Sequence, residues 1–169
     1  MIRRARVDDA PVLADLNARG WVFAYGDFVD VDRMLAQAGD LAGRFAAGLS
    51  DPGDPRHVWV TEDEDGRVVG FVTVGASRDA DARAGEGELI SIHVDPAIAG
   101  RGVGHALIQH GEAHLRELGH RAATLWVFED NARARRFYER HGWQLEPDAG
   151  PGPWTTWARS VRYRKALAA

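Results

Sequence analysis

Cysteine is absent from this chain of 169 residues. Its absence excludes disulfides, thiolate metal sites and a cysteine nucleophile, and it favours a reducing compartment. Long apolar runs are missing as well, because no stretch approaches the roughly 20 residues that span a membrane. The first residues, MIRRARVDDAP, lack the apolar core of a secretory signal. We therefore expect a cytoplasmic protein without a membrane partner.

Lysine is nearly absent too, since Lys165 is the only one and arginine carries almost all of the positive charge. The formal net charge of -4 argues against a dedicated nucleic-acid-binding protein, which would be basic over one face. One short segment nevertheless gathers Arg133, Arg135, Arg136 and Arg140. This segment is either the solvated face of a helix or a contact with the phosphates of a ligand.

The pattern of apolar residues, glycines and prolines predicts an α/β fold in a single domain over residues 1–169, with helices on both faces of a mixed sheet. Helix N-caps are expected at Asp8 or Asp9 and at Asn131. Gly20 is expected to interrupt the first helix. Predicted strands cover residues 2–7, 57–61, 68–74, 88–94, 122–128, 143–145 and 161–167. Two predicted helices begin after these N-caps, and two further helices are predicted over residues 31–49 and 102–118.

The most informative stretch is residues 86–107, EGELISIHVDPAIAGRGVGHAL. A strand pattern ends at Asp95 and Pro96, and the turn Gly100-Arg101-Gly102-Val103-Gly104 opens directly into a helical pattern. The free N–H groups of such a turn and the helix dipole favour an anionic ligand, and glycine lets the backbone approach a phosphate. A plain helix entry is also compatible with the turn. A Rossmann turn fits less well, because it has the spacing G-x-G-x-x-G after a first strand, whereas this turn reads G-x-G-x-G after a fourth strand. A Walker loop is excluded because no Gly-Lys-Ser/Thr follows.

A second segment, residues 124–143, reads TLWVFEDNARARRFYERHGW. Together the two segments resemble the GNAT superfamily of acyl-CoA-dependent N-acetyltransferases. The family pattern is V-x-P-x-x-[QR]-x-x-G-x-[GA], followed by N-x-x-A-x-x-[FL]-Y-x-x-x-G-[FW]. The likeness extends to the opening IRRARVDDAP and the closing RYRKAL, and so covers nearly the whole chain. Ala99 departs from the pattern, because it stands where Gln or Arg is usual, and Arg101 could partly replace the missing charge. The matching residues are Val94, Pro96, Gly102, Gly104, Asn131, Ala134, Phe137, Tyr138, Gly142 and Trp143.

The resemblance implies a GNAT fold, in which a mixed, mostly antiparallel sheet of about seven strands has strands 4 and 5 splayed apart. It also implies acetyl-CoA as the co-substrate. We expect no metal, because His110 and His114 have no apparent third ligand. The pantetheine arm would pair with the backbone of strand 4 at Ile92, His93 and Val94. Asn131 would cap its helix and lie near the coenzyme. The diphosphate would be bound by the N–H groups of Ala99, Gly100, Arg101, Gly102, Val103, Gly104 and His105.

Direct acetyl transfer to an amine requires a base for the amine, a donor for the oxyanion and an acid for the leaving thiolate. By position in the family pattern, Glu88 is the candidate base, taking the amine proton through a water, and Tyr138 is the candidate acid. The N–H of Val94 would serve the oxyanion. Glu88 could instead be a solvent-exposed carboxylate at a strand end, with Glu86 a weaker candidate, and Tyr138 could be a core aromatic. His93 has a pKa that suits a base, but a structural histidine is the alternative.

Several aromatic residues are expected to frame the acceptor, an amine with an apolar body. They are Trp21, Tyr25, Phe28, Trp154 and Trp157. A homodimer surface or plain packing is the alternative. His110 and His114 suit helix burial better than a metal site. The acceptor stays open between a small molecule and a protein N-terminus. A non-catalytic acyl-CoA-binding or regulatory module and a nucleotide-binding protein are the rival functions.

Overall fold

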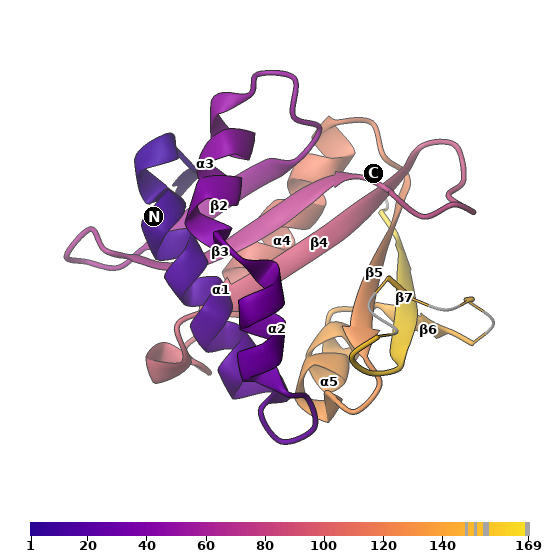
Figure 1. The fold of residues 1–169 in the computed structure, drawn as a ribbon. Coiled ribbons are helices and arrows are strands. Elements are labelled where there is room, and N and C mark those ends of the chain that lie inside the picture. Colours follow the sequence, from indigo (N-terminus) through magenta and orange to yellow (C-terminus); the bar gives the residue numbers. More distant parts are fainter. Residues whose placement is uncertain (148, 151, 154–155, 168–169) are drawn as a thin grey trace.

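In the computed structural model, which describes residues 1–147, 149–150, 152–153 and 156–167, the chain forms a seven-stranded sheet with helices on both faces (Figure 1). The strand order is β1-β2-β3-β4-β5-β7-β6, and neighbouring strands are antiparallel except for β4 and β5, which are parallel. The strands are β1 (Ile2–Arg4), β2 (His57–Glu62), β3 (Val68–Ala76), β4 (Glu86–Val94), β5 (Ala122–Phe128), β6 (Gln144–Glu146) and β7 (Ser160–Ala166). The helices are α1 (Ala10–Tyr25), α2 (Val31–Ala38), α3 (Leu41–Ser50), α4 (Val103–Glu117) and α5 (Ala132–Arg140). The predicted α/β fold is confirmed.

The sheet separates two cores, because successive side chains of a strand point to opposite faces. Phe71 of β3 packs with Leu13 and Leu16 of α1, whereas its neighbour Val72 packs with Leu107 of α4. Helices α1, α2 and α3 therefore cover one face, and α4 and α5 cover the other (Figure 1). No helix in the described part of the chain is long and apolar enough to cross a bilayer.

The expected helix over residues 31–49 is in fact two helices, α2 and α3. Gly39 has a φ of 64°, which ends α2. The side chain of Asp40 then caps α3 by accepting a hydrogen bond from the N–H of Gly43. A glycine at positive φ followed by an aspartate can therefore end one helix and begin the next. The periodicity of apolar residues alone does not reveal this boundary.

The expected interruption of the first helix at Gly20 is wrong, because α1 continues to Tyr25. A Cβ atom at Gly20 would lie 2.4 Å from Nδ1 of His93. Glycine at this position therefore lets α1 lie close against β4, and it serves packing rather than helix termination.

The parallel pairing of β4 and β5 is short and opens into a gap. The paired residues are Glu86 with Ala122, Gly87 with Ala123 and Glu88 with Thr124. Beyond this point β4 continues beside β3 and β5 continues beside β7, and the two described strands make no further pairs with each other. The β3–β4 register also shifts here, so that Ile90 forms a bulge where the gap opens. The predicted splaying of strands 4 and 5 is confirmed.

Candidate active site

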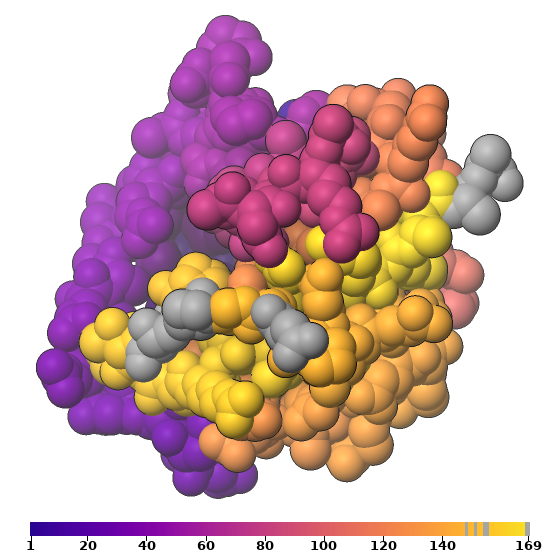
Figure 2. Space-filling model, turned by 90° about the vertical axis from the view of Figure 1, so that its right-hand side faces the viewer, coloured from indigo at the N-terminus to yellow at the C-terminus, as the bar shows by residue number. Residues whose placement is uncertain are grey.

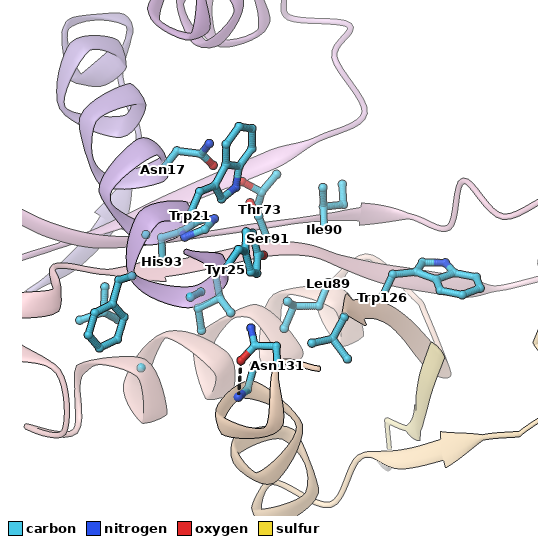
Figure 3. Close-up of a pocket in the computed structure, with 18 of the residues that line it drawn as sticks. Asn17, Trp21, Tyr25, Thr73, Leu89, Ile90, Ser91, His93, Trp126 and Asn131 are labelled. Carbon is cyan, nitrogen blue, oxygen red and sulfur yellow. Dashed lines mark hydrogen bonds between the residues drawn. The ribbon is translucent and has the colours of Figure 1, made fainter. Parts of the chain in front are cut away.

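The gap between β4 and β5 forms the floor of a cavity of about 1370 Å³ (Figure 3). Helix α1 and the segment that follows it form one wall, and the first turns of α4 and α5 form the other. Residues far apart in sequence meet here, as the sequence predicted. The predicted site residues that line the cavity are Trp21, Tyr25, Phe28, Ile92, His93, Val94, Ala99, Gly100, Gly102, Gly104, His105, Asn131 and Tyr138.

The first turn of α4 presents free N–H groups to this cavity. Gly100 and Gly102 have φ angles of 88° and 85°, so both occupy the left-handed region that the glycine turn predicted. The backbone N–H of Ala106 donates to the carbonyl of Gly102. The N–H groups of residues 103–105 therefore precede the first turn of hydrogen bonds, and the positive end of the helix dipole lies at the same place.

No side chain caps α4, in contrast to three other helices. Asp30, Asp40 and Asn131 accept hydrogen bonds from the first turns of α2, α3 and α5, whereas α4 begins at a glycine without a side-chain cap. An uncapped helix start leaves its donors for a ligand or for water. The expectation that all seven N–H groups of the turn are free is too generous, because Ala99 and Arg101 donate to carbonyls three residues earlier, at 3.3 Å.

The exposed edge of β4 offers further main-chain groups. The N–H of Asp95 donates to the carbonyl of Val69 at 2.9 Å. Because hydrogen-bonded and non-bonded pairs alternate along an antiparallel ladder, the main chain of His93 points to β3, whereas Ile92 and Val94 point across the gap toward β5. Ile92 and Val94 are thus placed to pair with an extended ligand. The expectation that the backbone of His93 does the same is corrected.

Tyr138 of α5 lines the cavity and is 8% exposed. Burial, with a smaller contribution from the neighbouring Tyr25, raises the pKa of its hydroxyl well above the usual value. The hydroxyl therefore keeps its proton at neutral pH and can serve as a hydrogen-bond donor. Beside it, Oδ1 of Asn131 accepts from the N–H of Ala134 at 3.1 Å, as predicted for the N-cap. The amide NH₂ group of Asn131 is left on the cavity side (Figure 3).

Glu88 is not a free carboxylate at a strand end. Its side chain is 4% exposed, and Arg78 donates to both of its oxygens, from Nη2 at 2.7 Å and from Nε at 2.9 Å. Arg78 lines the cavity and Glu88 does not. Glu86, the weaker candidate, is likewise buried in an ion pair, with Arg164. Neither carboxylate is placed to meet an amine directly, so Glu88 could act as the predicted base only through a water that passes Arg78.

The side chain of His93 points into the cavity beside Asn17 and Trp21 (Figure 3). Its ring centroid lies 5.3 Å from that of Phe71. Burial lowers the pKa of this imidazole to about 4. Because amines have pKa values of roughly 8 to 10, a group this weakly basic is a poor proton acceptor from them. The lowered basicity of the ring, rather than its position in the cavity, therefore favours a structural histidine over a base.

Sequence reasoning missed three neutral polar residues above the gap. Asn17 of α1, Thr73 of β3 and Ser91 of β4 lie close together at the cavity wall (Figure 3). Asn17 and Thr73 are buried. Their side-chain oxygens can accept hydrogen bonds from an amine without adding charge. Strand alternation from His93 could have placed Ser91 on this face, but nothing local in the sequence places Asn17 opposite it.

The aromatic residues expected at the acceptor side form one cluster around Phe128. Ring centroids are 4.8 Å apart for Tyr25 with Phe128 and 6.1 Å for Phe28 with Phe128. Burial raises the pKa of Tyr25 to about 12. Trp21 joins the same cluster and lines the cavity as well. These residues thus combine packing with wall formation. Trp154 lies outside the described residues.

A histidine bridge at the other end of the cavity was also missed. Nδ1 of His105 lies 2.8 Å from Nε2 of His141, and both residues line the cavity. Nδ1 of His141 lies 2.7 Å from the carbonyl of Phe137, so that nitrogen carries a proton and Nε2 accepts from His105. The bridge joins the first turn of α4 to the end of α5. The two histidines are 36 residues apart, and no pattern in the sequence links them.

The remaining histidines lie on the α4 face of the sheet. Nε2 of His114 lies 2.9 Å from Nδ1 of His57, and the ring of His110 packs 4.3 Å from that of Trp59. Across the described residues, no three His, Asp or Glu side chains are arranged to hold a metal ion. His110 and His114 therefore lie in a packed interface between α4 and β2, and they do not belong to the cavity.

An uncapped helix start beside two parted strands is the arrangement that the two sequence motifs predicted. Comparison with known families agrees, because the profile described as the Acetyltransferase (GNAT) family matches residues 25–143. The chain belongs to the GNAT family. The matched residues include the parted strands β4 and β5, the α4 turn and Tyr138. The GNAT fold is also seen in PaiA N-acetyltransferase from Thermoplasma acidophilum, solved in complex with coenzyme A. That structure has a TM-score of 0.80 at 16% identity and covers 98% of both chains.

Relatives within the family include mycothiol acetyltransferase from Propionibacterium freudenreichii subsp. shermanii, which is 41% identical over 101 residues. That match covers 59% of this GNAT chain and 32% of the relative. An uncharacterized N-acetyltransferase from Mycobacterium tuberculosis is 30% identical over 139 residues, covering 81% of this chain and 84% of that protein. The chain spans between 32% and 44% of the length of three mycothiol acetyltransferases that it matches.

Proposed function

We propose that this chain transfers an acetyl group from acetyl-CoA directly to a primary amine. The observation that carries the proposal is the uncapped start of α4, which opens onto the gap between β4 and β5. The N–H groups of residues 103–105 would bind the diphosphate, and each hydrogen bond to a charged oxygen contributes roughly 1.5–3 kcal/mol. Ile92 and Val94 would pair with the pantetheine arm. Two proteins of similar fold were solved in complex with coenzyme A and with acetyl-CoA, and this supports the choice of co-substrate.

The chemical step forms a C–N bond and breaks the C–S bond of the thioester. An acetyl-cysteine intermediate is impossible, since the chain has no cysteine, so the amine attacks directly. The main-chain N–H of Val94 or Ile92 would donate to the oxyanion, and the hydroxyl of Tyr138 would protonate the leaving thiolate. Arg78 donates hydrogen bonds to both carboxylate oxygens of Glu88. We therefore propose that water in the cavity accepts the proton of the attacking amine.

The acceptor we favour is the amine of a small molecule with an apolar part, and a protein N-terminus is the second candidate. The aromatic cluster of Trp21, Tyr25 and Phe28 suits such a body, and the neutral oxygens of Asn17 and Thr73 suit an uncharged amine. The names of the mycothiol acetyltransferase relatives also favour a small molecule. The rival function is a module that binds acyl-CoA without catalysis.

Two measurements test this function. Calorimetric titration with coenzyme A, NAD and ATP is expected to give binding with coenzyme A alone. A thiol-release assay with acetyl-CoA over a panel of small amines and short peptides is expected to find turnover that depends on the amine. Binding of coenzyme A without turnover of any amine would support the non-catalytic module. Equal or tighter binding of NAD or ATP would refute the coenzyme assignment.

A further inference from the structure

Trp126 is a cavity residue that neither motif includes. It lies on β5, two positions beyond Thr124, the last residue of β5 that pairs with β4. Leu125 and Val127, on either side, point into the core on the α4 face. Because side chains alternate along a strand, Trp126 points to the opposite face, where Phe128 packs against α1 and α2. Trp126 lines the cavity at the end where the two strands begin to part, beyond Leu89, and its indole is directed away from Trp21 and His93 (Figure 3).

The indole of Trp126 is held at its polar edge and against its ring. Nε1 donates to Oδ1 of Asp79 at 2.8 Å. The other oxygen of Asp79 accepts from Oγ1 of Thr124 at 3.3 Å and from Nη1 of Arg162 at 3.2 Å. The guanidinium carbon of Arg162 also lies 5.4 Å from the centroid of the indole. At Gly152 a Cβ atom would come within 2.8 Å of the ring, so the backbone closes on it there.

Arg162 ties the segment between β3 and β4 to this wall. Its side chain is 5% exposed, and its guanidinium contacts Asp81 at 2.6 and 2.8 Å and Glu146 at 2.7 Å, in addition to Asp79. The segment that carries Asp79 and Asp81, pink in Figure 2, consequently lies beside the yellow C-terminal strand. Asp79 contacts both Trp126 and Arg162, whereas Asp81 forms its ion pair with Arg162. The two aspartates thus share Arg162 as a partner and differ in their contact with the indole and in exposure, at 13% for Asp79 and 65% for Asp81.

We infer that Trp126 is a specificity-determining residue for the acceptor, and that Asp79 is the positioning residue that fixes its indole. This inference rests on the proposed function. The ring lies on the α1 and α2 face of β5, apart from the α4 turn that would hold the diphosphate. A fixed indole there would offer apolar surface, on the part that Arg162 and Gly152 leave uncovered, to the group next to the attacked amine. The acceptor class is therefore an amine with an aromatic or bulky apolar group close to its nitrogen.

The kinetic test compares two acceptors, an arylalkylamine and a short alkylamine, in Trp126→Ala, Trp126→Phe, Asp79→Ala and Asp81→Ala. Trp126→Ala is expected to raise the KM of the arylalkylamine about tenfold, since an aromatic contact is lost, and to leave the KM of acetyl-CoA unchanged. Asp79→Ala is expected to give a rise of about threefold to tenfold, and Asp81→Ala a rise under about twofold. Asp79→Asn keeps an oxygen acceptor and should restore part of the loss. The double variant Asp79→Ala/Trp126→Phe should raise the KM of the arylalkylamine no further than the more severe of the two single variants. Both substitutions remove the same hydrogen bond between Asp79 and Trp126.

An activity-independent measurement accompanies the kinetics. The indole N–H resonance of Trp126, assigned by its loss in Trp126→Phe, is expected to exchange slowly with solvent in the wild type and in Asp81→Ala, and fast in Asp79→Ala. Equal effects of Asp79→Ala and Asp81→Ala would overturn the positioning role. A parallel rise in the KM of acetyl-CoA, or an equal effect on both amines, would overturn the specificity role. If the wild type turns over no amine, the proposed function fails and the specificity role with it, while the exchange of the indole N–H still decides the role of Asp79.

Discussion

Arg78 donates to both carboxylate oxygens of Glu88, at 2.7 and 2.9 Å, and so stands between the sequence-predicted base and the cavity. A carboxylate held in this way is a structural anion, because Glu88 is 4% exposed and its negative charge is matched by Arg78, whose side chain is 54% exposed. We therefore expect Glu88→Gln to reduce kcat less than about tenfold, well short of the 10²- to 10⁴-fold contribution of a general base. The pH profile of kcat/KM should keep its shape, while the melting temperature falls. Thiol-release kinetics and thermal unfolding measure the two effects.

Glu86→Gln is the matched control, because Glu86 is also a buried carboxylate on β4 with an arginine partner. Both variants should lose stability with similar, small effects on kcat. A loss of kcat above about 100-fold in Glu88→Gln alone, with the acidic limb of the profile gone, would restore Glu88 as the base.

Tyr138 is expected to act as the acid for the leaving thiolate. Tyr138→Phe keeps the ring in the core and removes the hydroxyl, so kcat should fall about 100-fold, while the dissociation constant of coenzyme A stays within about twofold. Tyr25→Phe is the control, since Tyr25 is a second, half-buried tyrosine of the same cavity. Single-turnover measurements separate the chemical step from product release. Similar losses in both variants would mean that Tyr138 merely packs in the core.

The features that the sequence predicts correctly are those set by residues close together in the chain. Strand β5 and the Asn131 cap were predicted correctly, because both follow from residues within one short segment. The parted strands followed from the family resemblance. The environment of Glu88 was not predictable, since Arg78 approaches it from a loop ten residues away in sequence, and a carboxylate has the same pattern whether it is paired or free. The hydrogen bond of Trp126 to Asp79 spans 47 residues and leaves no periodic signal.

Gly102 is expected to serve both the backbone and the coenzyme. Ala in the left-handed region costs about 1–2 kcal/mol, so Gly102→Ala should lower the free energy of unfolding by that amount. It should also weaken coenzyme A binding about tenfold to 100-fold, because a Cβ atom there would keep a phosphate from the N–H groups. Gly119→Ala at the other end of α4 is the matched control, with a φ of 87° and no atom within 4 Å of its Cβ position. It should lose the same stability without any change in coenzyme A affinity. Equal affinity in both variants would argue against a phosphate at the α4 turn.

His93 is expected to make the protein less stable in acid. Burial lowers the pKa of its imidazole from 6.5 to about 4, so between these values the unfolded chain binds a proton that the folded chain refuses. Stability contributed by the neutral ring is therefore fully present above pH 6.5 and is lost as the pH falls toward 4, by up to about 3 kcal/mol. His93→Gln stays uncharged in both states and lacks this dependence. Urea unfolding of both proteins from pH 7.5 to 4.5 measures it, and the difference between them cancels the other titrating groups. The wild type should lose its advantage over the variant step by step below pH 6.5. A difference that stays constant over the whole range would mean that the ring takes up its proton in the folded protein, and the case against His93 as a base would then fail.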